Sequence, residues 1–534
     1  MANKSVFITG ASGTMGWASF KEIYDRRPDL DINVLLRDSE KNRKLFAPYL
    51  GDARVKIVWG DFEDYDAIKK CVDGASYVLH IGGLVSPAAD YWPKKTFKVN
   101  TTAAEYIVKA VKAQKNPDDI VVVYIGTVAQ TGNRPDPIHW ARTGDPIKTS
   151  IYDHYAVSKT MAEAIFAESG LKKWVSMRQS GILYPEILKN MDPIMFHVPL
   201  NGVLEWATVE DSATLMCNVC SDDLPDDFFR RFYNIGSGPE YRLTNYEFED
   251  YLLYTIGMGH NATKKLFSPN WFITKNFHGQ WYSDSQVLED YLHFRHNTPV
   301  DAYFAEILGS SVPGVYKLSG LAANPIGKFF MKRIALDKRF GTLTWVKNQD
   351  KNRLTAFFGS LEDYNKIPDS WDNFKIYRPS DEPTYLDHGY DEKKKTADLD
   401  INDMKKAAEF RGGECTSKTM KKGDLDTPLQ WKCQFGHEFE MSPNLVLKGG
   451  QWCPECLPLP WNYDEIAKGN PFFAQVWTPD HDADEHNVYD WDIYKDYDEF
   501  AGKPEAFNDV NEVHDKYKYG FTEAAKAKAA KEKK

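Results

Sequence analysis

Three side chains combine residue types and spacing that suit proton transfer at an oxygen atom. Tyr155 and Lys159 lie in the stretch "DHYAVSKTMAEAIFAESG", where a helix places residues i and i+4 on one face. An ammonium group beside a phenol favours the phenolate, which predicts a pKa for Tyr155 below the usual value of about 10. Thr127 ends the apolar stretch "VVVYIGT", where its hydroxyl can hydrogen-bond a substrate oxygen. The set predicts a tyrosine acid/base.

A glycine-rich turn near the start of the chain predicts a bound dinucleotide. In "VFITGASGTMGW" the glycines Gly10, Gly13 and Gly16 follow an apolar run and precede a helical stretch. They allow a tight turn, close approach of backbone N–H groups to a pyrophosphate, and close helix packing. We therefore predict that the turn binds the cofactor through Gly10, Ser12, Gly13, Thr14, Met15 and Gly16.

The end of the second apolar run, "VLLRDSEKNRK", bears on the choice of cofactor. An acidic residue at this strand tip accepts hydrogen bonds from the ribose 2′-OH of NAD, whereas an arginine accommodates the 2′-phosphate of NADP. Arg37 occupies the expected tip, and Asp38 follows it directly. The sequence favours NADP(H) over NAD(H), but Asp38 leaves NAD open, and Arg37 could also belong to a solvated basic start of a helix.

Seven apolar runs separated by helix-length segments must position these residues. They are "SVFITG", "INVLLR", "VKIVWG", "YVLHIGG", "IVVVYIGT", "WVSMRQSGILY" and "RFYNIG". This alternation is typical of βαβ units, so we predict an α/β fold with a doubly wound Rossmann parallel sheet. We divide the chain into a dinucleotide-binding domain (1–260), a substrate-side region with a linker (261–400), a cysteine-bearing module (401–515) and a charged tail (516–534).

Length, charge and hydropathy exclude several classes of function. The chain has 534 residues and a mass of 61.1 kDa, so two or three domains are expected. A net charge of −11 gives no general attraction to nucleic acid. No apolar run approaches the roughly 20 residues that span a bilayer, and the start "MANKS" lacks a secretory pattern. We expect a cytoplasmic protein with a small-molecule substrate.

The motifs together resemble the extended short-chain dehydrogenase/reductase family, with its epimerase/dehydratase and hydroxysteroid dehydrogenase branches. The resemblance covers residues 4–260 and rests on "TGASGTMG", "GDFED", "HIGG", "VNTTAA", Thr127 and "YAVSK". It implies that Asp61 and Phe62 flank the adenine, that Asn100 belongs to the cofactor site, and that Lys159 also binds the nicotinamide ribose. It further implies hydride transfer at a CH–OH group by Thr127, Tyr155 and Lys159, and dimerisation through helices of the nucleotide domain.

The substrate is less well defined by the sequence. A stretch expected over the nicotinamide carries only one cation, Lys189, and is otherwise rich in the apolar residues Met191, Ile194, Met195, Phe196, Leu200 and Trp206. It favours a bulky apolar alcohol or ketone, with a hydroxysteroid as the sharpest prediction, although ordinary core packing explains it equally well. The alternatives are a nucleotide-sugar epimerase or dehydratase, using cations such as Arg178, Arg230, Arg231 and Arg242, and a non-catalytic NAD(P)-binding redox sensor.

Four of the seven cysteines predict a structural zinc site. Cys415, Cys433, Cys453 and Cys456 have the spacing C-x17-C-x19-C-x2-C, which suits a tetrahedral site of four thiolates. The segment resembles a zinc ribbon whose first cysteine pair is spread out, so His437 is the alternative to Cys415. Cys217 and Cys220 have no second ligand pair, and with Cys71 they are predicted to be buried in the core.

Overall fold

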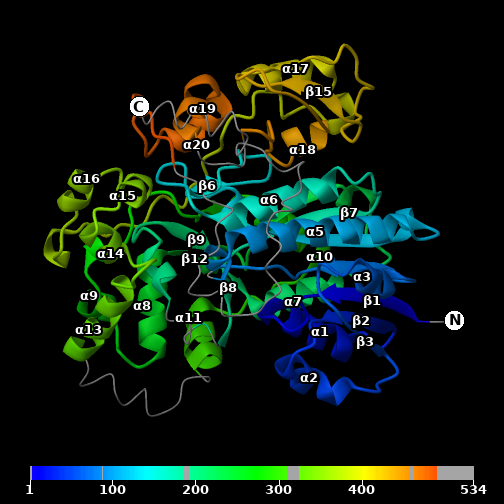
Figure 1. Cartoon of the computed structure of the whole chain (residues 1–534), viewed down its shortest axis with the longest axis horizontal. Coiled ribbons are helices and arrows are strands. Elements are labelled where there is room, and N and C mark those ends of the chain that lie inside the picture. Colours follow the sequence, from blue (N-terminus) through cyan, green and yellow to red (C-terminus); the bar gives the residue numbers. More distant parts are fainter. Residues whose placement is uncertain are drawn as a thin grey trace.

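The computed structural model describes residues 3–86, 88–185, 187, 192–309, 324–456 and 462–489. Its centre is a parallel sheet of seven strands in the order β11-β7-β5-β4-β1-β2-β3 (Figure 1). All seven strands predicted from apolar runs are confirmed: β1 (Lys4–Thr9), β2 (Leu30–Leu36), β3 (Val55–Trp59), β4 (Tyr77–His80), β5 (Val121–Thr127), β7 (Trp174–Gln179) and β11 (Arg231–Ile235). The strand order reverses between β1 and β4, which is where doubly wound folds bind ligands.

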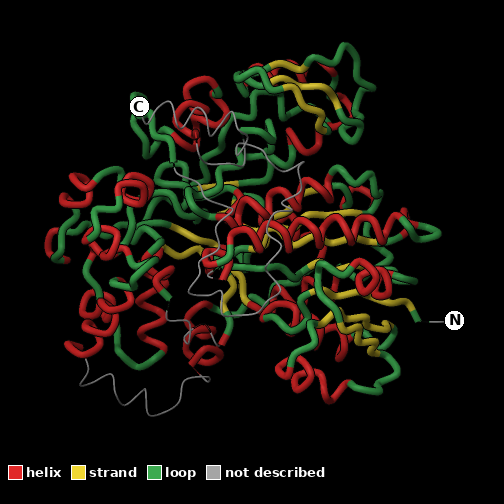
Figure 2. The backbone as a smooth tube through the Cα atoms, viewed as in Figure 1, coloured by secondary structure: helices red, strands yellow, loops and turns green. Residues whose placement is uncertain are grey.

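Helices cover both faces of this sheet, so its strands are apolar on both sides (Figure 2). The alternation of strand side chains is visible in β1, where Phe7 joins one buried cluster while Val6 and Ile8 join another. The second cluster lies under α1 (Thr14–Arg26) and α7 (Val209–Asn218). The first lies under α3 (Tyr65–Val72), α5 (Pro93–Lys112) and α6 (His154–Ala167). The short helices α2 (Glu40–Phe46) and α4 (Ala88–Tyr91) complete this part.

The rest of the chain up to residue 400 adds short strands and helices, of which α10 (Ser285–Leu292) packs against β11 of the large sheet. The strands form two-stranded pairs: β6 (Trp140–Ala141) with β13 (Trp281–Tyr282), β8 (Ile182–Leu183) with β10 (Ala207–Thr208), and β9 (Val203–Glu205) with β12 (Arg242–Thr244). The helices are α8 (Asn245–Thr255), α9 (Ala262–Leu266), α10 (Ser285–Leu292), α11 (Val300–Ala302), α13 (Asn324–Ala335), α14 (Thr342–Lys347), α15 (Lys351–Phe358) and α16 (Leu361–Lys366).

The C-terminal module comprises residues 401–456 and 462–489 in the described chain. A three-stranded antiparallel sheet of β14 (Glu414–Cys415), β15 (Leu429–Lys432) and β16 (Glu438–Met441) is followed by α18 (Pro443–Leu447). The other helices are α17 (Ile401–Phe410), α19 (Tyr463–Gly469) and α20 (Pro471–Trp477). One continuous buried cluster joins this module to the α5–α6 face of the large sheet. The predicted tail, residues 516–534, lies outside the described residues.

The polar stretch predicted to be a linker lies against the first domain. The carbonyl oxygen of Ser380 accepts hydrogen bonds from His139 and from the Trp140 indole. Further along, Glu392 pairs with Arg142 through two hydrogen bonds. Most of residues 377–398 are exposed, and the contacts above attach this segment to the loop between β5 and α6. Within the described residues, no helix has the length and apolar character needed to span a membrane.

Candidate functional site

The turn after β1 can be built only from glycine at two positions. Gly10 has a φ of +69°, and a Cβ there would lie 2.6 Å from Cα of Gly82. A Cβ on Gly16 would lie 2.1 Å from the carbonyl oxygen of Gly10. Gly13 donates its N–H to that same oxygen at 2.8 Å and begins α1 without a side-chain cap. The first N–H groups of α1 are therefore available to an anion, as a pyrophosphate site requires.

The loop after β4 packs directly on this turn. Thr9 Oγ1 lies 2.9 Å from Nδ1 of His80 and accepts a hydrogen bond from the Gly82 N–H at 3.0 Å. The ring of Phe62 closes the other side, because a Cβ on Gly82 would lie 2.5 Å from its Cζ. Burial, together with the charge of Lys159, lowers the pKa of His80 well below its usual value, so this imidazole is neutral. Asp61, next to Phe62, is exposed.

Asn100, on α5, connects the β4 loop to the helix that carries the predicted acid/base. Its Oδ1 accepts the N–H of Leu84 at 2.8 Å, and its Nδ2 donates to the Leu84 carbonyl at 3.1 Å. The same Nδ2 donates to Oγ of Ser158 on α6 at 2.9 Å. Asn100 thus has a structural role within the predicted cofactor site that fixes the spacing between two of its walls.

The three predicted catalytic residues are brought together at the carboxyl edge of the sheet. α6 begins where Asp153 accepts the N–H of Ala156, and this start places Tyr155 and Lys159 on the helix as predicted. The buried Nζ of Lys159 lies 4.4 Å from the centre of the Tyr124 ring, and a Cβ on Gly83 would lie 3.9 Å from it. Thr127 lies close enough to Tyr155 to lower the pKa of its phenol.

Thr127 is held rigidly at the end of β5. Its Oγ1 accepts the N–H of Ala129 at 3.3 Å, and its own N–H donates to Oε1 of Gln130 at 2.8 Å. These two bonds form a capping box for the short 3₁₀ helix η3 (Val128–Gln130). The threonine hydroxyl is therefore fixed before any substrate arrives, which is what orientation of a reacting oxygen requires.

The predicted lowering of the Tyr155 pKa is wrong for the protein alone. Burial raises the pKa of Tyr155 above its usual value and Asp153 adds to this, while the nearby Thr127 lowers it. Lys159 does not offset the burial, because its own pKa is lowered and the amine is neutral before the phenol ionises. Burial lowers the pKa of Lys159 to about 7, against the opposing charge of Glu163. At neutral pH the site holds a protonated phenol and an amine that is only partly charged.

At the tip of β2, Asp38 forms an ion pair with Arg43, whereas the guanidinium of Arg37 forms none among the described residues. Asp38 accepts two hydrogen bonds of 2.6 Å from Arg43, whose guanidinium also lies over the Trp59 ring at 4.8 Å. Arg37 is exposed, and no ion pair in the described part of the chain involves it. The arrangement leaves a cation rather than a carboxylate available at this position.

The apolar residues expected over the nicotinamide pack mainly into the protein's own core. Phe196 and Leu200 belong to a buried cluster with Phe267 and Trp271. Met195 and its neighbour Ile194 are only partly buried, and Met195 packs against the same cluster. Trp206 stacks on Phe248 with ring centres 4.0 Å apart. Met191 and Lys189 lie outside the described residues. Core packing, the alternative to an apolar substrate site, thus accounts for Phe196, Leu200 and Trp206.

The four arginines considered for a diphosphate already have partners. Arg178 is buried and pairs with Glu163 at 2.7 Å, Arg242 pairs with Glu205 at 2.8 Å, and Arg230 pairs with Asp426 at 3.1 Å. Arg231 donates to the Asp227 carbonyl and to the Tyr291 hydroxyl. In this structure all four guanidinium groups are therefore bonded to other groups of the protein.

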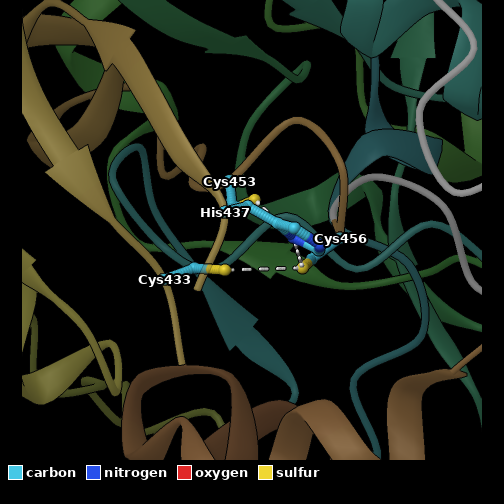
Figure 3. A group of neighbouring side chains, drawn as sticks. All are labelled: Cys433, His437, Cys453 and Cys456. Atoms are coloured by element: carbon cyan, nitrogen blue, oxygen red, sulfur yellow. Dashed lines mark hydrogen bonds between the residues drawn. The ribbon is translucent and has the colours of Figure 1, made fainter. Parts of the chain in front are cut away.

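A second constellation lies in the C-terminal module (Figure 3). Ligand atoms of Cys433, His437, Cys453 and Cys456 all lie within 4.8 Å of one another. Sγ of Cys433 is 3.9 Å from Sγ of Cys456, which in turn is 3.3 Å from Nδ1 of His437. A tetrahedron with metal–sulfur bonds of about 2.3 Å has edges of about 3.8 Å. The donor set and its dimensions therefore fit one metal ion.

Cys415 is not part of this group, so the prediction that Cys415 is a zinc ligand is wrong for this structure. It lies in β14 opposite Trp431, and its sulfur is not among the ligand atoms that gather within 4.8 Å of one another in the described chain. His437, just before β16, takes its place. The remaining cysteines, Cys71, Cys217 and Cys220, are free thiols in the core, as predicted.

Comparisons with known proteins find similarity in the part of the chain that contains the first constellation. Residues 6–178 match the NAD dependent epimerase/dehydratase family. Cinnamoyl-CoA reductase 1 of Arabidopsis thaliana is 25% identical over 205 residues, and UDP-glucose 4-epimerase of Rickettsia bellii is 27% identical over 124 residues. These matches cover 37% and 22% of this chain and span 58% and 36% of those relatives.

Among solved structures, a dTDP-glucose 4,6-dehydratase from Bacillus anthracis in complex with NAD has a TM-score of 0.46 at 15% identity. The similarity covers 57% of this chain and 95% of that one. The C-terminal module, with its Cys/His group, lies beyond the family match. Residues 6–178, which contain the glycine turn, Thr127, Tyr155 and Lys159, thus match the NAD dependent epimerase/dehydratase family.

Proposed function

We propose that the chain is an NAD(P)-dependent enzyme of the epimerase/dehydratase type, which moves a hydride and a proton at a secondary alcohol or ketone. The observation that carries the proposal is the placement of Thr127, Tyr155 and Lys159 at one edge of the sheet, beside the glycine turn. Gathering a hydroxyl, a phenol and an amine at the topological switch point is what such chemistry requires.

The glycine turn, the Gly82 loop and Lys159 would hold the dinucleotide, whose nicotinamide supplies or accepts the hydride when bound. Thr127, fixed by its capping box, orients the reacting oxygen. Tyr155 is a protonated phenol in the free protein, so it can donate a proton to a ketone oxygen hydrogen-bonded to both groups. In the reverse direction the charged form of Lys159 assists loss of that proton.

A hydroxyl-rich substrate of the nucleotide-sugar class is favoured over a hydroxysteroid. The residues that suggested an apolar site largely pack in the core, and several relatives are UDP-glucose 4-epimerases. Gln130 and Gln179, which flank Thr127, each carry a buried amide nitrogen without a hydrogen-bond partner among the described residues. Buried donors of this kind select ligands that bring acceptor oxygens.

A net reduction or oxidation of a bulky alcohol or ketone is the second candidate. The similarity to cinnamoyl-CoA reductase 1, which extends over 205 residues, favours it. The two candidates differ in their use of cofactor: an epimerase returns the hydride within one cycle, whereas a reductase consumes one dinucleotide per turnover.

The deciding experiment incubates the full chain with nucleotide sugars and, separately, with hydroxysteroids and other bulky ketones, in the presence of NAD(H) or NADP(H). Sugar interconversion without net change in nicotinamide absorbance supports the epimerase. Stoichiometric absorbance change supports a reductase. Tyr155→Phe protein serves as the background control. Absence of dinucleotide binding, measured by calorimetry, would overturn both candidates.

The preference for NADP(H) rests on Arg37. Replacing Arg37 with alanine should raise the KM for NADP(H) about 10- to 100-fold and change the KM for NAD(H) less than about twofold, because one charge-assisted contact to the 2′-phosphate is lost. Arg43→Ala is the matched control: it frees Asp38 and should favour NAD(H) instead. Initial rates with each cofactor measure the effect. A strong preference of the unmodified chain for NADH would refute the role of Arg37.

The pKa of Lys159 makes dinucleotide binding pH-dependent. Because burial lowers it to about 7, the amine is mostly neutral at about pH 8.5 in the free protein. An anionic ligand favours the ammonium form, so binding at that pH should take up as much as about one proton, and affinity should fall as pH rises from about 7 to 9.

Calorimetry in buffers of different ionisation enthalpy measures this uptake. Lys159→Met, which keeps the length of the side chain without a charge, should abolish it. Uptake that persists in this variant would assign the proton to another group.

The proposed function includes a structural Zn²⁺ bound by Cys433, His437, Cys453 and Cys456. Three thiolates and one imidazole are a donor set that prefers zinc, and four protein ligands leave no open position for catalysis. Zinc would join β15, β16 and the loop after α18, and so stabilise a module whose strands are short.

A further inference from the structure

The helix that carries Tyr155 and Lys159 is held along its length by the C-terminal module. Figure 1 shows α18 lying next to α6, and contacts between the two helices confirm it. Before α6 begins, the hydroxyls of Thr149 and Tyr463 lie 3.1 Å apart. Where it ends, Glu168 accepts hydrogen bonds from the N–H and the hydroxyl of Ser442.

The central contact lies one turn beyond Lys159. Nε2 of Gln451 donates to the Thr160 carbonyl at 3.3 Å and to Oε1 of Glu163 at 3.2 Å. Nη2 of Arg178 donates to the same Oε1 at 2.7 Å and to the Gly449 carbonyl at 2.6 Å. Glu163 and Arg178 are fully buried, so the loop 449–451 closes a hydrogen-bonded network on the inner side of α6.

The loop 449–451 has little freedom of its own. Gly450 has a φ of +72° and a Cβ there would lie 1.9 Å from the Asp145 carbonyl oxygen. The Gly450 carbonyl accepts the N–H of Ile147 at 3.2 Å. Two residues after Gln451 comes Cys453, a member of the Cys/His group. A metal ion in that group would therefore fix one end of the loop, and the first domain fixes the other.

We propose that loop 449–451 is a clamp that positions the catalytic helix, so that metal occupancy in the C-terminal module controls dinucleotide binding at the other side of α6. Gln451 and Glu163 are its positioning residues. The inference rests on the proposed function, since it concerns the geometry of Tyr155 and Lys159. It gives the module, which lies beyond the family match, a role in the reaction.

The charge of Glu163 strengthens the coupling between loop 449–451 and Lys159. Glu163 lies one turn from Lys159 and opposes the effect of burial on the pKa of that lysine. Arg178 on β7 balances the carboxylate, Tyr124 on β5 faces the amine with its ring, and His80 on β4 is neutral. Gln451 holds the carboxylate in place, so a displaced loop alters the position of the negative charge nearest to Lys159 on α6.

Gln451→Met tests the clamp, because methionine fills the same volume without donating either hydrogen bond. Gln430→Met is the matched control: Gln430 is exposed on β15 of the same module and bonds only within it. Hydrogen exchange of α6, residues 154–167, and the KM for the dinucleotide are measured in both variants, and in the unmodified chain before and after removal of the metal with a chelator.

Gln451→Met and metal removal should each raise exchange in α6 about tenfold and the dinucleotide KM about fivefold or more, with the sugar KM unchanged. Gln430→Met should change neither. A purely structural role would reduce the amount of active protein and leave KM untouched. Unchanged α6 exchange in Gln451→Met, or after metal removal, would overturn the clamp. If α6 exchange rises in Gln451→Met and after metal removal, but the chain binds no dinucleotide, the positioning of α6 by loop 449–451 stands and the proposed function is refuted.

Discussion

Tyr155→Phe should lower turnover by about 10³-fold while leaving dinucleotide affinity within about twofold. The substitution removes one oxygen atom, and with it the proton donor that lies beside Thr127. The ring remains, so the packing of α6 and the position of Lys159 are retained. Single-turnover rates in both directions, together with calorimetric titration of the cofactor, separate the chemical step from binding.

Tyr254→Phe is the control for this experiment, since Tyr254 is exposed on α8. It should behave as the unmodified chain. A Tyr155→Phe protein with near-normal turnover would eliminate this phenol as the acid/base, and a loss of cofactor binding equal to the loss of turnover would indicate a structural role instead.

Cys453→Ser should remove the metal and destabilise the C-terminal module. The Cys453 side chain is fully buried, and a structural zinc ion contributes about 10–16 kcal/mol of apparent binding free energy in small zinc domains. The zinc content measured on purified protein should fall from about one ion per chain to near zero, because one of four ligands is lost. The thermal unfolding midpoint should fall with it.

Two further variants decide between the predicted and the observed ligand sets. Cys415→Ser should retain the metal, because Cys415 packs opposite Trp431 in the strand ladder, whereas His437→Ala should lose most of it. The reverse result would restore the four-cysteine site. A metal-free unmodified chain, purified without chelators, would exclude the zinc proposal.

The parts of the fold that were predictable depend on local sequence. Each parallel strand is a short apolar run, and each is followed by the turn or helix that the sequence indicates, so all seven strands and their order along the chain follow. The pairing of Tyr155 with Lys159 needs only helical periodicity. The glycine turn needs only its neighbours, β1 and α1.

The parts that failed depend on contacts between distant segments. The Tyr155 pKa is set by burial, which no local pattern reveals. The exchange of Cys415 for His437 depends on how the ends of β15 and β16 and the loop 449–456 come together in space. Gln451, 288 residues from Glu163 along the chain, shows no signal in the sequence at all. Tyr124 was predicted only as part of a strand, yet its ring faces the amine of Lys159.

The buried cluster shared by the large sheet and the C-terminal module has a consequence for biosynthesis. Ala162 and Phe166 of α6 share that cluster with Leu445, Trp452 and Phe473. When residues 1–260 have left the ribosome, Phe166 already packs on Tyr124 of β5, but the part of α6 that contacts α18 and the loop 449–451 still faces water, and its covering arrives more than 180 residues later. The nascent protein therefore completes its α5–α6 layer only near the end of translation, and a chain that stops early presents an unfinished apolar surface to chaperones and proteases.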